Sequence, residues 1–506
     1  MVSAPFSATS YASFSAGLMK DLRNSLTDLQ RQLSTGQKSL TYGGLGQDRF
    51  ASLNYNAKLS TLNGYSNVIQ SSSFRLSMMD TALNNFSSTI QSAQTAATAG
   101  SYEPDASGRP IAQVSADDQI KMMIDLMNTD ISGQYLFSGR SSDTKPVLGY
   151  DAIMNGTAGK AGVKQMIAER QAADLGTGGL GRLEAPSISG STVTLQRDAT
   201  NTGPFGFTIS GVSTTSANIA TSGPAGAQQT TTINFTGQPN DADTVTVTLT
   251  LPDGSTQDVT LKAAQSTPVP TNGFLIGATP AATAANFQTA LQTAVQKQAE
   301  TSLKASSSIV ASQAFFAGSN SSPPQRVPSP AASATGLVAG TSANTVIWYQ
   351  GDDDTTSFPN ARSTATAKVG DALTVNTGAR ANEAAFQQSF AMLAALSLTD
   401  VAPSDPNGQE RYAALTQRVG NGLSFPNNMQ SVKSVQMELA NSNSSINTAK
   451  DRLTATKNVI QASLDKIQNT DDQEVTASIL ALQTRLEATY STTATLSGLS
   501  LTKFLS

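Results

Sequence analysis

The clearest pattern in the chain lies near its C-terminal end, where apolar residues recur at alternating spacings of three and four residues. The run begins at Val432 and ends at Ile467. Its members are Val432, Val435, Leu439, Ile446, Ala449, Leu453, Ile460 and Ile467, with weaker positions at Ser442, Thr456 and Ser463. A period of about 3.5 residues is typical of a coiled-coil seam, because the stripe of a lone straight helix would drift around its axis. We therefore expect residues 431–467 to form a helix that pairs with another helix.

A polar stretch at residues 468–474 interrupts this pattern, and a second apolar run follows it. That run comprises Val475, Ile479, Leu482, Leu486 and Thr489, and the chain ends with Leu499, Leu501, Phe504 and Leu505. Residues 468–506 are thus predicted to form a break and a second helix. Between Val475 and Ser506 the charged residues are Arg485, Glu487 and Lys503. Because so few charges solvate this helix, we expect neighbouring subunits to bury it; the alternative is a bundle core within one chain.

The N-terminal end carries a matching leucine stripe, which predicts the partner helix. The stripe comprises Leu18, Leu22, Leu26, Leu29 and Leu33, and Gly36 suits a helix C-terminal cap. Residues 1–40 are therefore interpreted as an N-terminal assembly helix. Its first 19 residues are rich in Ser and Ala and have little reason to fold alone. The candidate assembly interface consists of this leucine stripe with Ile479, Leu482, Leu486, Leu499, Leu501, Phe504 and Leu505.

Further helical patterns predict that both ends belong to a bundle. A helix is expected from about Arg49 to Ala99, with a seam at Leu76, Met79, Leu83, Phe86 and Ile90, and another from about Ile111 to Ile131. These place the N-terminal part of the bundle at residues 41–185. After short strands that include residues 346–349, helical spacing resumes at Ala384, so residues 341–430 return to the bundle.

The pattern changes to alternation of apolar and polar residues after about Pro186. Strands are predicted at residues 205–212, 230–235 and 243–251, with a hairpin turn at residues 252–255 and one helix at residues 281–305. Residues 186–340 are therefore expected to form an inserted β-rich outer domain. The predicted fold class is α+β, an elongated antiparallel coiled-coil helical bundle built from both termini around this insertion.

Composition removes several function classes. The chain has 506 residues with 13% charged, a net charge of −4, and neither cysteine nor histidine. The absence of cysteine excludes thiolate chemistry and disulfides. The absence of histidine removes the commonest general base and the commonest metal ligand. No run of Lys and Arg favours nucleic acid, and no apolar stretch is long enough for membrane insertion. We find no catalytic constellation, so we expect no enzyme activity and no cofactor. Residues 352–354 are three consecutive aspartates, interpreted as a solvated acidic loop in preference to a calcium site.

Two internal segments carry a resemblance to a known family. Residues 131–140 read Ile-Ser-Gly-Gln-Tyr-Leu-Phe-Ser-Gly-Arg, and residues 348–353 read Trp-Tyr-Gln-Gly-Asp-Asp, followed by Val-Gly-Asp at 369–371 and Thr-Val-Asn at 374–376. These, with the terminal Leu-Ser-Leu-Thr-Lys-Phe-Leu, resemble the bacterial flagellin superfamily, closest to its hook-associated hook-filament junction proteins. The matching motif positions are Gly133, Tyr135, Leu136, Phe137, Gly139, Tyr349, Gly351 and Asp352. Residues 46–50 read Gly-Gln-Asp-Arg-Phe and lack the Asp-Asp-Pro element common in the family.

The resemblance implies a structural role at the cell exterior. It implies a junction subunit between hook and filament that assembles with itself, with flagellin and with the other hook-filament junction protein. It also implies a cytoplasmic export chaperone and export through the flagellar secretion system without a cleaved signal peptide, to an extracellular place in the bacterial flagellum. A filament-forming flagellin is the alternative, and a cell-surface binding protein that uses the β-rich domain is a further one.

Overall fold

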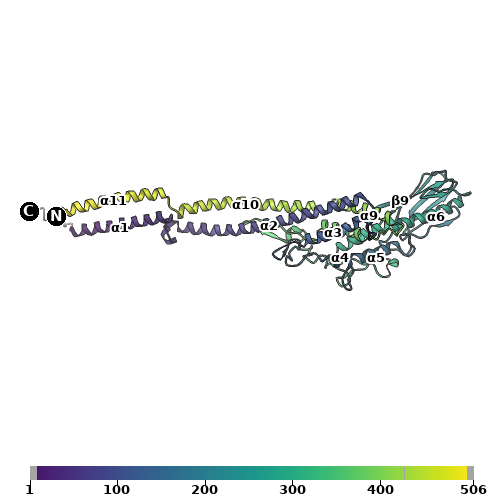
Figure 1. The fold of residues 1–506 in the computed structure, drawn as a ribbon, viewed down its shortest axis with the longest axis horizontal. Coiled ribbons are helices and arrows are strands. Elements are labelled where there is room, and N and C mark those ends of the chain that lie inside the picture. Colours follow the sequence, from purple (N-terminus) through teal and green to yellow (C-terminus); the bar gives the residue numbers. More distant parts are fainter. Residues whose placement is uncertain (1–7, 427, 499–506) are drawn as a thin grey trace, which may run out of the picture. The chain divides into compact units, whose positions relative to one another are not determined.

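The structure is a computed structural model that describes residues 8–426 and 428–498 (Figure 1). It mixes helices and antiparallel sheets, which confirms the predicted α+β class. The chain divides into two compact units. The terminal unit comprises Met1–Ser71, Lys368–Thr374 and Ser445–Ser506, and the central unit comprises Ser72–Ala367 and Val375–Ser444.

In the terminal unit, helices from the two ends of the sequence lie side by side. Helix α1 (Ala8–Thr35) packs against α11 (Asp472–Gly498), as Figure 1 shows. The end of α1 is tied to the break before α11 by two backbone hydrogen bonds, from Lys38 N to Gln468 O (2.8 Å) and from Thr470 N to Gly36 O (3.0 Å). Residues 8–19, which the sequence gives little reason to fold alone, are helical in α1, where α11 supplies the partner that an isolated helix would lack.

Two longer helices contribute residues to both units. Helix α2 (Arg49–Ala99) follows the short 3-10 helix η1 (Tyr42–Asp48), and α10 (Val432–Gln468) precedes α11. The predicted bounds of α2 and its apolar seam are confirmed, because Leu76, Met79, Leu83, Phe86 and Ile90 are all buried. In α10 the predicted stripe is buried or half-buried as far as Leu453, and its later members Ile460, Ser463 and Ile467 are half-buried. Thr456 is exposed, whereas Leu464, which the pattern did not include, is buried.

The central unit contains the shorter helices around one buried helix. They are α3 (Ile111–Met127), α4 (Tyr150–Asn155), α5 (Val163–Leu175), α7 (Lys304–Phe316), α8 (Ala384–Leu398) and α9 (Gly408–Leu423). Helix α8 packs against α3, α7 and α9. Its Phe390 ring lies 5.6 Å from the Phe316 ring and 5.4 Å from Trp348, and Phe386 lies 5.1 Å from Phe86. These aromatic contacts form the centre of the helical core.

Two local predictions in this unit are wrong. Helix α3 ends at Met127 and not at Ile131, because the chain turns into a tight hairpin of β1 (Asp130–Ile131) and β2 (Gln134–Tyr135). The Asp130 carboxylate closes that turn by accepting a hydrogen bond from Gly133 N. Residues 346–349 form no strand. Tyr349 pairs with Val147 in an isolated bridge.

Two four-stranded sheets share one core. The first has the order β3 (Ser187–Ser189), β4 (Thr192–Leu195), β7 (Thr230–Phe235), β6 (Ile219–Ala225), and the second has the order β10 (Gly273–Leu275), β9 (Thr256–Ala264), β8 (Thr244–Thr250), β5 (Thr208–Thr214). All pairs are antiparallel except β9 with β10. The predicted hairpin is confirmed, with Thr250 opposite Thr256. The predicted strand at residues 205–212 begins three residues later, at Thr208.

The helix predicted at residues 281–305 is longer than expected. It begins as α6 (Pro280–Gln298), passes through one π-helical turn, η2 (Ala299–Leu303), and continues as α7. Helix α6 buries Phe287, Leu291 and Val295 in the core of the sheets, whereas α7 packs against α5, α8 and α9. Residues 318–345 then return across α5 with the short helix η3 (Ala331–Ser333). The short elements η4 (Ala361–Thr364), β11 (Thr366–Lys368) and β12 (Thr374–Asn376) precede α8.

Candidate functional site

The paired helices α1 and α11 carry the predicted assembly residues. Val475 and Leu486 of α11, the helix that packs against α1, are buried, each with 6% of its surface exposed. The half-buried members of the same seam are Leu22, Leu26, Leu29, Ile479 and Leu482. The Arg23 guanidinium carbon lies 5.7 Å from the centre of the Tyr490 ring. Much of the predicted stripe therefore serves to pair the two ends of one chain.

Other apolar side chains of this helix pair point into solvent. Leu18 is 45% exposed and Leu33 is 40% exposed, and both belong to the predicted stripe. Phe14, at 70%, and Leu480, at 59%, are more exposed and were not among the predicted interface residues. We call Phe14, Leu18, Leu33 and Leu480 the exposed apolar set. Leu499, Leu501, Phe504 and Leu505 lie outside the described residues.

A second group of exposed apolar residues surrounds η1, between α1 and α2. It comprises Leu40, Tyr42, Phe50 and Leu53, exposed by 64%, 44%, 75% and 42%. Sequence reasoning missed this group, because its members lie outside the periodic apolar runs from which the helices were predicted. Large apolar residues beside a glycine-rich turn were the available signal.

The two family-like segments meet in the central unit. Asp352 N donates to Ser138 O (2.9 Å), Ala381 N donates to Phe137 O (2.8 Å), and Gly139 N donates to Ala379 O (3.1 Å). Residues 137–139 therefore lie between the segment around residue 352 and the segment that leads into α8. We call this contact the motif junction.

The Asp352 carboxylate is the centre of the motif junction. Arg140 donates to it through Nε (3.0 Å) and Nη2 (2.8 Å), and Arg380 donates through Nη2 (3.0 Å). The side chains of Asp352 and Arg380 are 5% and 3% exposed. Burial alone would raise the pKa of the Asp352 carboxyl, but the hydrogen bonds from the two arginines outweigh it and hold this pKa well below its usual range. The carboxylate is thus ionised and fixed, an arrangement that joins chain segments.

Most other motif residues pack around this ion pair. Leu136, Phe137 and Tyr349 are almost fully buried, and the Tyr349 hydroxyl donates to Asp352 O (3.3 Å). Tyr135 of β2 is half-buried. Gly133, in the turn between β1 and β2, is exposed. Gly139 has a φ of +66°, and a Cβ there would lie 2.9 Å from Asp352 Cβ. A Cβ on Gly351 would lie 2.4 Å from the Tyr349 hydroxyl. Both glycines are therefore required by close packing.

The interpretation of residues 352–354 as a solvated acidic loop is wrong for Asp352. Asp353 accepts a hydrogen bond from Asn320 N (3.0 Å), and Asp354 accepts one from Arg140 Nη2 (3.2 Å). Sequence reasoning missed the roles of Arg140 and Arg380, although Arg140 ends the motif segment. Among residues 8–426 and 428–498, no group of three or more acidic side chains is arranged to hold a metal ion.

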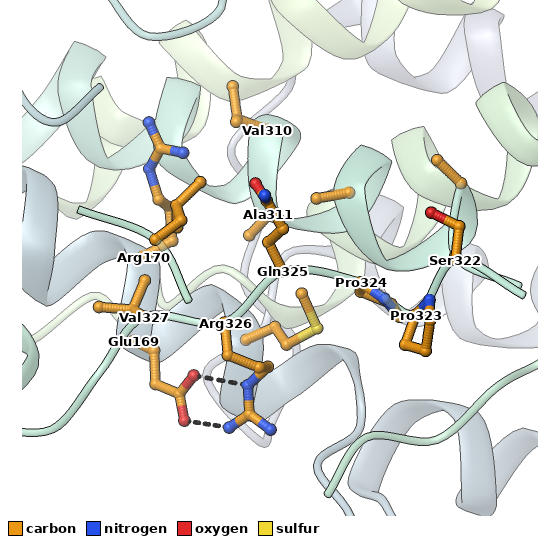
Figure 2. A pocket seen from close by; sticks show the side chains of 15 residues that line it. Glu169, Arg170, Val310, Ala311, Ser322, Pro323, Pro324, Gln325, Arg326 and Val327 are labelled. Atoms are coloured by element: carbon orange, nitrogen blue, oxygen red, sulfur yellow. Dashed lines mark hydrogen bonds and ion pairs between the residues drawn. The ribbon is translucent and has the colours of Figure 1, made fainter. Parts of the chain in front are cut away.

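A cavity of about 240 Å³ opens elsewhere in the central unit, between α5, α7 and residues 318–327 (Figure 2). Arg326 forms a forked ion pair with Glu169, with Nε to Oε2 at 3.0 Å and Nη2 to Oε1 at 2.5 Å. The third charged residue of the lining, Arg170, pairs with Asp174 (2.7 Å). The charges around the cavity are therefore neutralised within the chain.

Comparison with protein families and curated proteins finds no match. No protein-family model matches the chain, and no curated protein resembles it significantly. None of the described helices combines the length and the apolarity that a membrane span requires.

Proposed function

We propose that the chain is a structural subunit of the bacterial flagellum, of the kind that joins the hook to the filament. The observation that carries this proposal is the exposed apolar set on the pair of helices α1 and α11. Phe14, Leu18 and Leu480 stay in water even though the two helices bury their seam against each other. Large apolar side chains that remain exposed on a folded helix pair are typical of a surface that another protein covers.

The two helices act in this proposal as a preformed assembly element. They wind about each other as an antiparallel coiled coil, and their outer faces contact neighbouring copies. The outer face of α1 differs from the outer face of α11. Each copy therefore contacts the next copy through one of these faces and the previous copy through the other. Such a heterologous interface builds a ring or a helical tube.

The motif junction supports the same proposal. The segments at residues 131–140 and 348–353 both resemble hook-filament junction proteins, and they meet through Asp352 and its two arginines. The two segments are far apart in the sequence, yet they pack together, and this contact needs both of them. The likeness therefore has a physical basis that a chance match in one segment would lack.

The proposal includes the partners that the likeness implies. The chain would meet flagellin on one side and the other hook-filament junction protein on the other. Before assembly a cytoplasmic chaperone would cover the apolar faces of α1 and α11, and the flagellar secretion system would export the chain to the cell exterior. The two-sheet region, residues 187–275 with α6, would take no part in these contacts.

Complementation of a strain that lacks the gene tests the proposal. Leu480→Lys places a charge on the exposed apolar set, and Gln483→Lys is the matched control, because Gln483 is an exposed polar residue of the same helix. We expect Gln483→Lys to restore filaments and Leu480→Lys to leave bare hooks, while immunoblots detect both variants outside the cell. Filaments restored by Leu480→Lys as well as by the wild type would contradict the proposal.

A further inference from the structure

The helix that leads out of the two-sheet region contains one irregular turn. Residues 280–316 are helical throughout, but residues 299–303 form a π turn between α6 and α7. The turn is not a frayed end, since Ala299 and Leu303 have 0% and 1% of their surface exposed. An extra residue in one turn rotates everything after it, and π turns weaken the regular hydrogen-bond ladder.

This turn lies where the packing partner of the helix changes. Phe287, Leu291 and Val295 of α6 belong to the core of the two sheets, and Ala299 and Leu303 are its last members from this helix. From Lys304 onward the helix packs against α5, α8 and α9. All these elements belong to the central unit. The π turn is therefore the boundary between the two-sheet region and the helical core.

A buried arginine of α9 holds the turn. Arg411 is 2% exposed, and its Nε donates to the Glu300 carbonyl oxygen at 2.7 Å. The other two nitrogens of its guanidinium donate to Asp400 O and to Asp405 Oδ2, both at 2.7 Å. The planar fork of an arginine thus fixes the backbone of the π turn to α9 and to the loop before it.

A second arginine on the same helix holds the neighbouring hairpin. Arg418 donates through Nε to Asp253 Oδ2 (2.8 Å) and through Nη2 to Ser255 Oγ (3.1 Å), at the tip between β8 and β9. Asp253 N also donates to Ser306 Oγ of α7 (3.0 Å). Arg411 and Arg418 are seven residues apart, so they lie on one face of α9.

We propose that α9 is a clamp that sets the orientation of the two-sheet region, and that the π turn is the hinge about which this region moves when the clamp is released. The proposal does not depend on the flagellar role. The two arginines fix two points of the region, the π turn and the hairpin tip, to one rigid helix. With both arginines removed, Asp253 N still donates to Ser306 Oγ and Lys297 of α6 still pairs with Glu410 of α9, at 2.7 Å. The helix that joins the region to the helical core then passes through the π turn with its weakened backbone ladder.

Distances between spin labels test this hinge in the full chain. The sequence contains no cysteine, so Lys262→Cys on β9 and Met122→Cys on α3 provide two unique labelling sites, both exposed. We expect one narrow distance distribution in this background and a distribution at least about twice as broad after Arg411→Ala with Arg418→Ala. Arg326→Ala is the matched control, because it removes a partly buried forked ion pair that does not touch α9.

Hydrogen exchange of the unaltered chain gives an independent test that needs no folded variant. We expect the amides of residues 300–304 to exchange about ten times faster, or more, than those of residues 309–313 in α7, although three of the five residues in each segment are buried and the other two are half-buried. Equal protection of the two segments would overturn the hinge. A double arginine variant that folds and keeps the narrow distribution, or a control that broadens it equally, would overturn the clamp.

Discussion

Replacing Asp352 with asparagine removes the charge at the centre of the motif junction while keeping the shape of the side chain. Three side-chain hydrogen bonds from Arg140 and Arg380 end on this carboxylate. Arg140 is partly in solvent, with 42% of its side chain exposed, and can find water instead. Arg380, which is 3% exposed, would keep a buried charge without its carboxylate. The cost of Asp352→Asn is therefore expected to come mainly from Arg380.

Breaking a buried ion pair by removing one partner costs about 3–5 kcal/mol, because the remaining charge stays out of water. Arg380 keeps hydrogen bonds to Phe358 O and Asp354 O, at 2.9 Å each, which offsets part of the loss. We expect Asp352→Asn to lower the free energy of unfolding of the central unit by roughly 3 kcal/mol. Asp353→Asn is the control, and we expect it to cost no more than about 1 kcal/mol, because Asp353 accepts a backbone hydrogen bond and its shape is kept.

The single tryptophan reports this region directly. Trp348 is fully buried next to Tyr349, and its Nε1 donates to Phe316 O (2.8 Å). Urea unfolding followed by its fluorescence therefore reads the central unit. At a slope of about 2–3 kcal/mol per molar urea, the midpoint should fall by roughly 1 M. A shift no larger than that of Asp353→Asn would refute the reasoning.

The effect must also depend on pH with a defined sign. The pKa of Asp352 is lowered in the folded state, so its carboxylate contributes stability that is fully present above the unfolded pKa of about 3.9 and is lost as pH falls below it. We expect the difference between the wild type and Asp352→Asn to be constant from pH 5 to 7 and to shrink only below about pH 4. A difference that vanishes near pH 6 would point to another group.

Four further substitutions test the packing. Gly139→Ala should destabilise the central unit by about 1–3 kcal/mol in the same fluorescence assay, because φ is +66° and the new Cβ would meet Asp352 Cβ. Phe86→Ala should cost about 3–5 kcal/mol there, since its ring is fully buried against Phe386 and Phe390. Leu486→Ala should speed hydrogen exchange in α1 and leave α8 unchanged, whereas Leu480→Ala should change neither, because Leu486 is buried in the helix pair and Leu480 is 59% exposed. Equal effects of the two leucine variants would place the seam elsewhere.

Long periodic stretches were the part of the fold that the sequence predicted best. The bounds of α2 were predicted correctly, because its apolar seam repeats over many turns and Gly100 follows its end. The β8–β9 hairpin was also predicted, because the alternation of threonine with valine and leucine is typical of a half-buried strand. In both cases the local signal agrees with the final packing.

Helix α7 and the π turn escaped prediction for a physical reason. Residues 306–308 are serines that lie fully buried in α7, where an apolar stripe would have been the usual signal. Their burial is tolerated because Ser307 and Ser308 donate to carbonyl oxygens four residues earlier, at 2.8 and 2.9 Å. The backbone of the π turn accepts a hydrogen bond from Arg411, which lies more than 100 residues away, so the local sequence does not contain this contact.

The candidate sites, too, were predicted from the sequence only in part. The stripe on α1 and the stripe on α11 were found by their spacing, but spacing does not tell which members face the partner helix and which face solvent. Phe14 and Leu480 fall outside the strict seam and are the more exposed. The motif junction was found only as two separate segments, since the contact of Asp352 with Arg140 joins residues 212 positions apart.

Electron microscopy of cells that lack the gene is the most direct test of the proposed role in the flagellum. We predict complete hooks without filaments, with flagellin released into the medium. Loss of the filament shaft with no block at the hook would instead indicate a filament-forming flagellin. Normal flagella in the deletion strain would contradict the flagellar role and leave surface binding by the two-sheet region as the hypothesis to test.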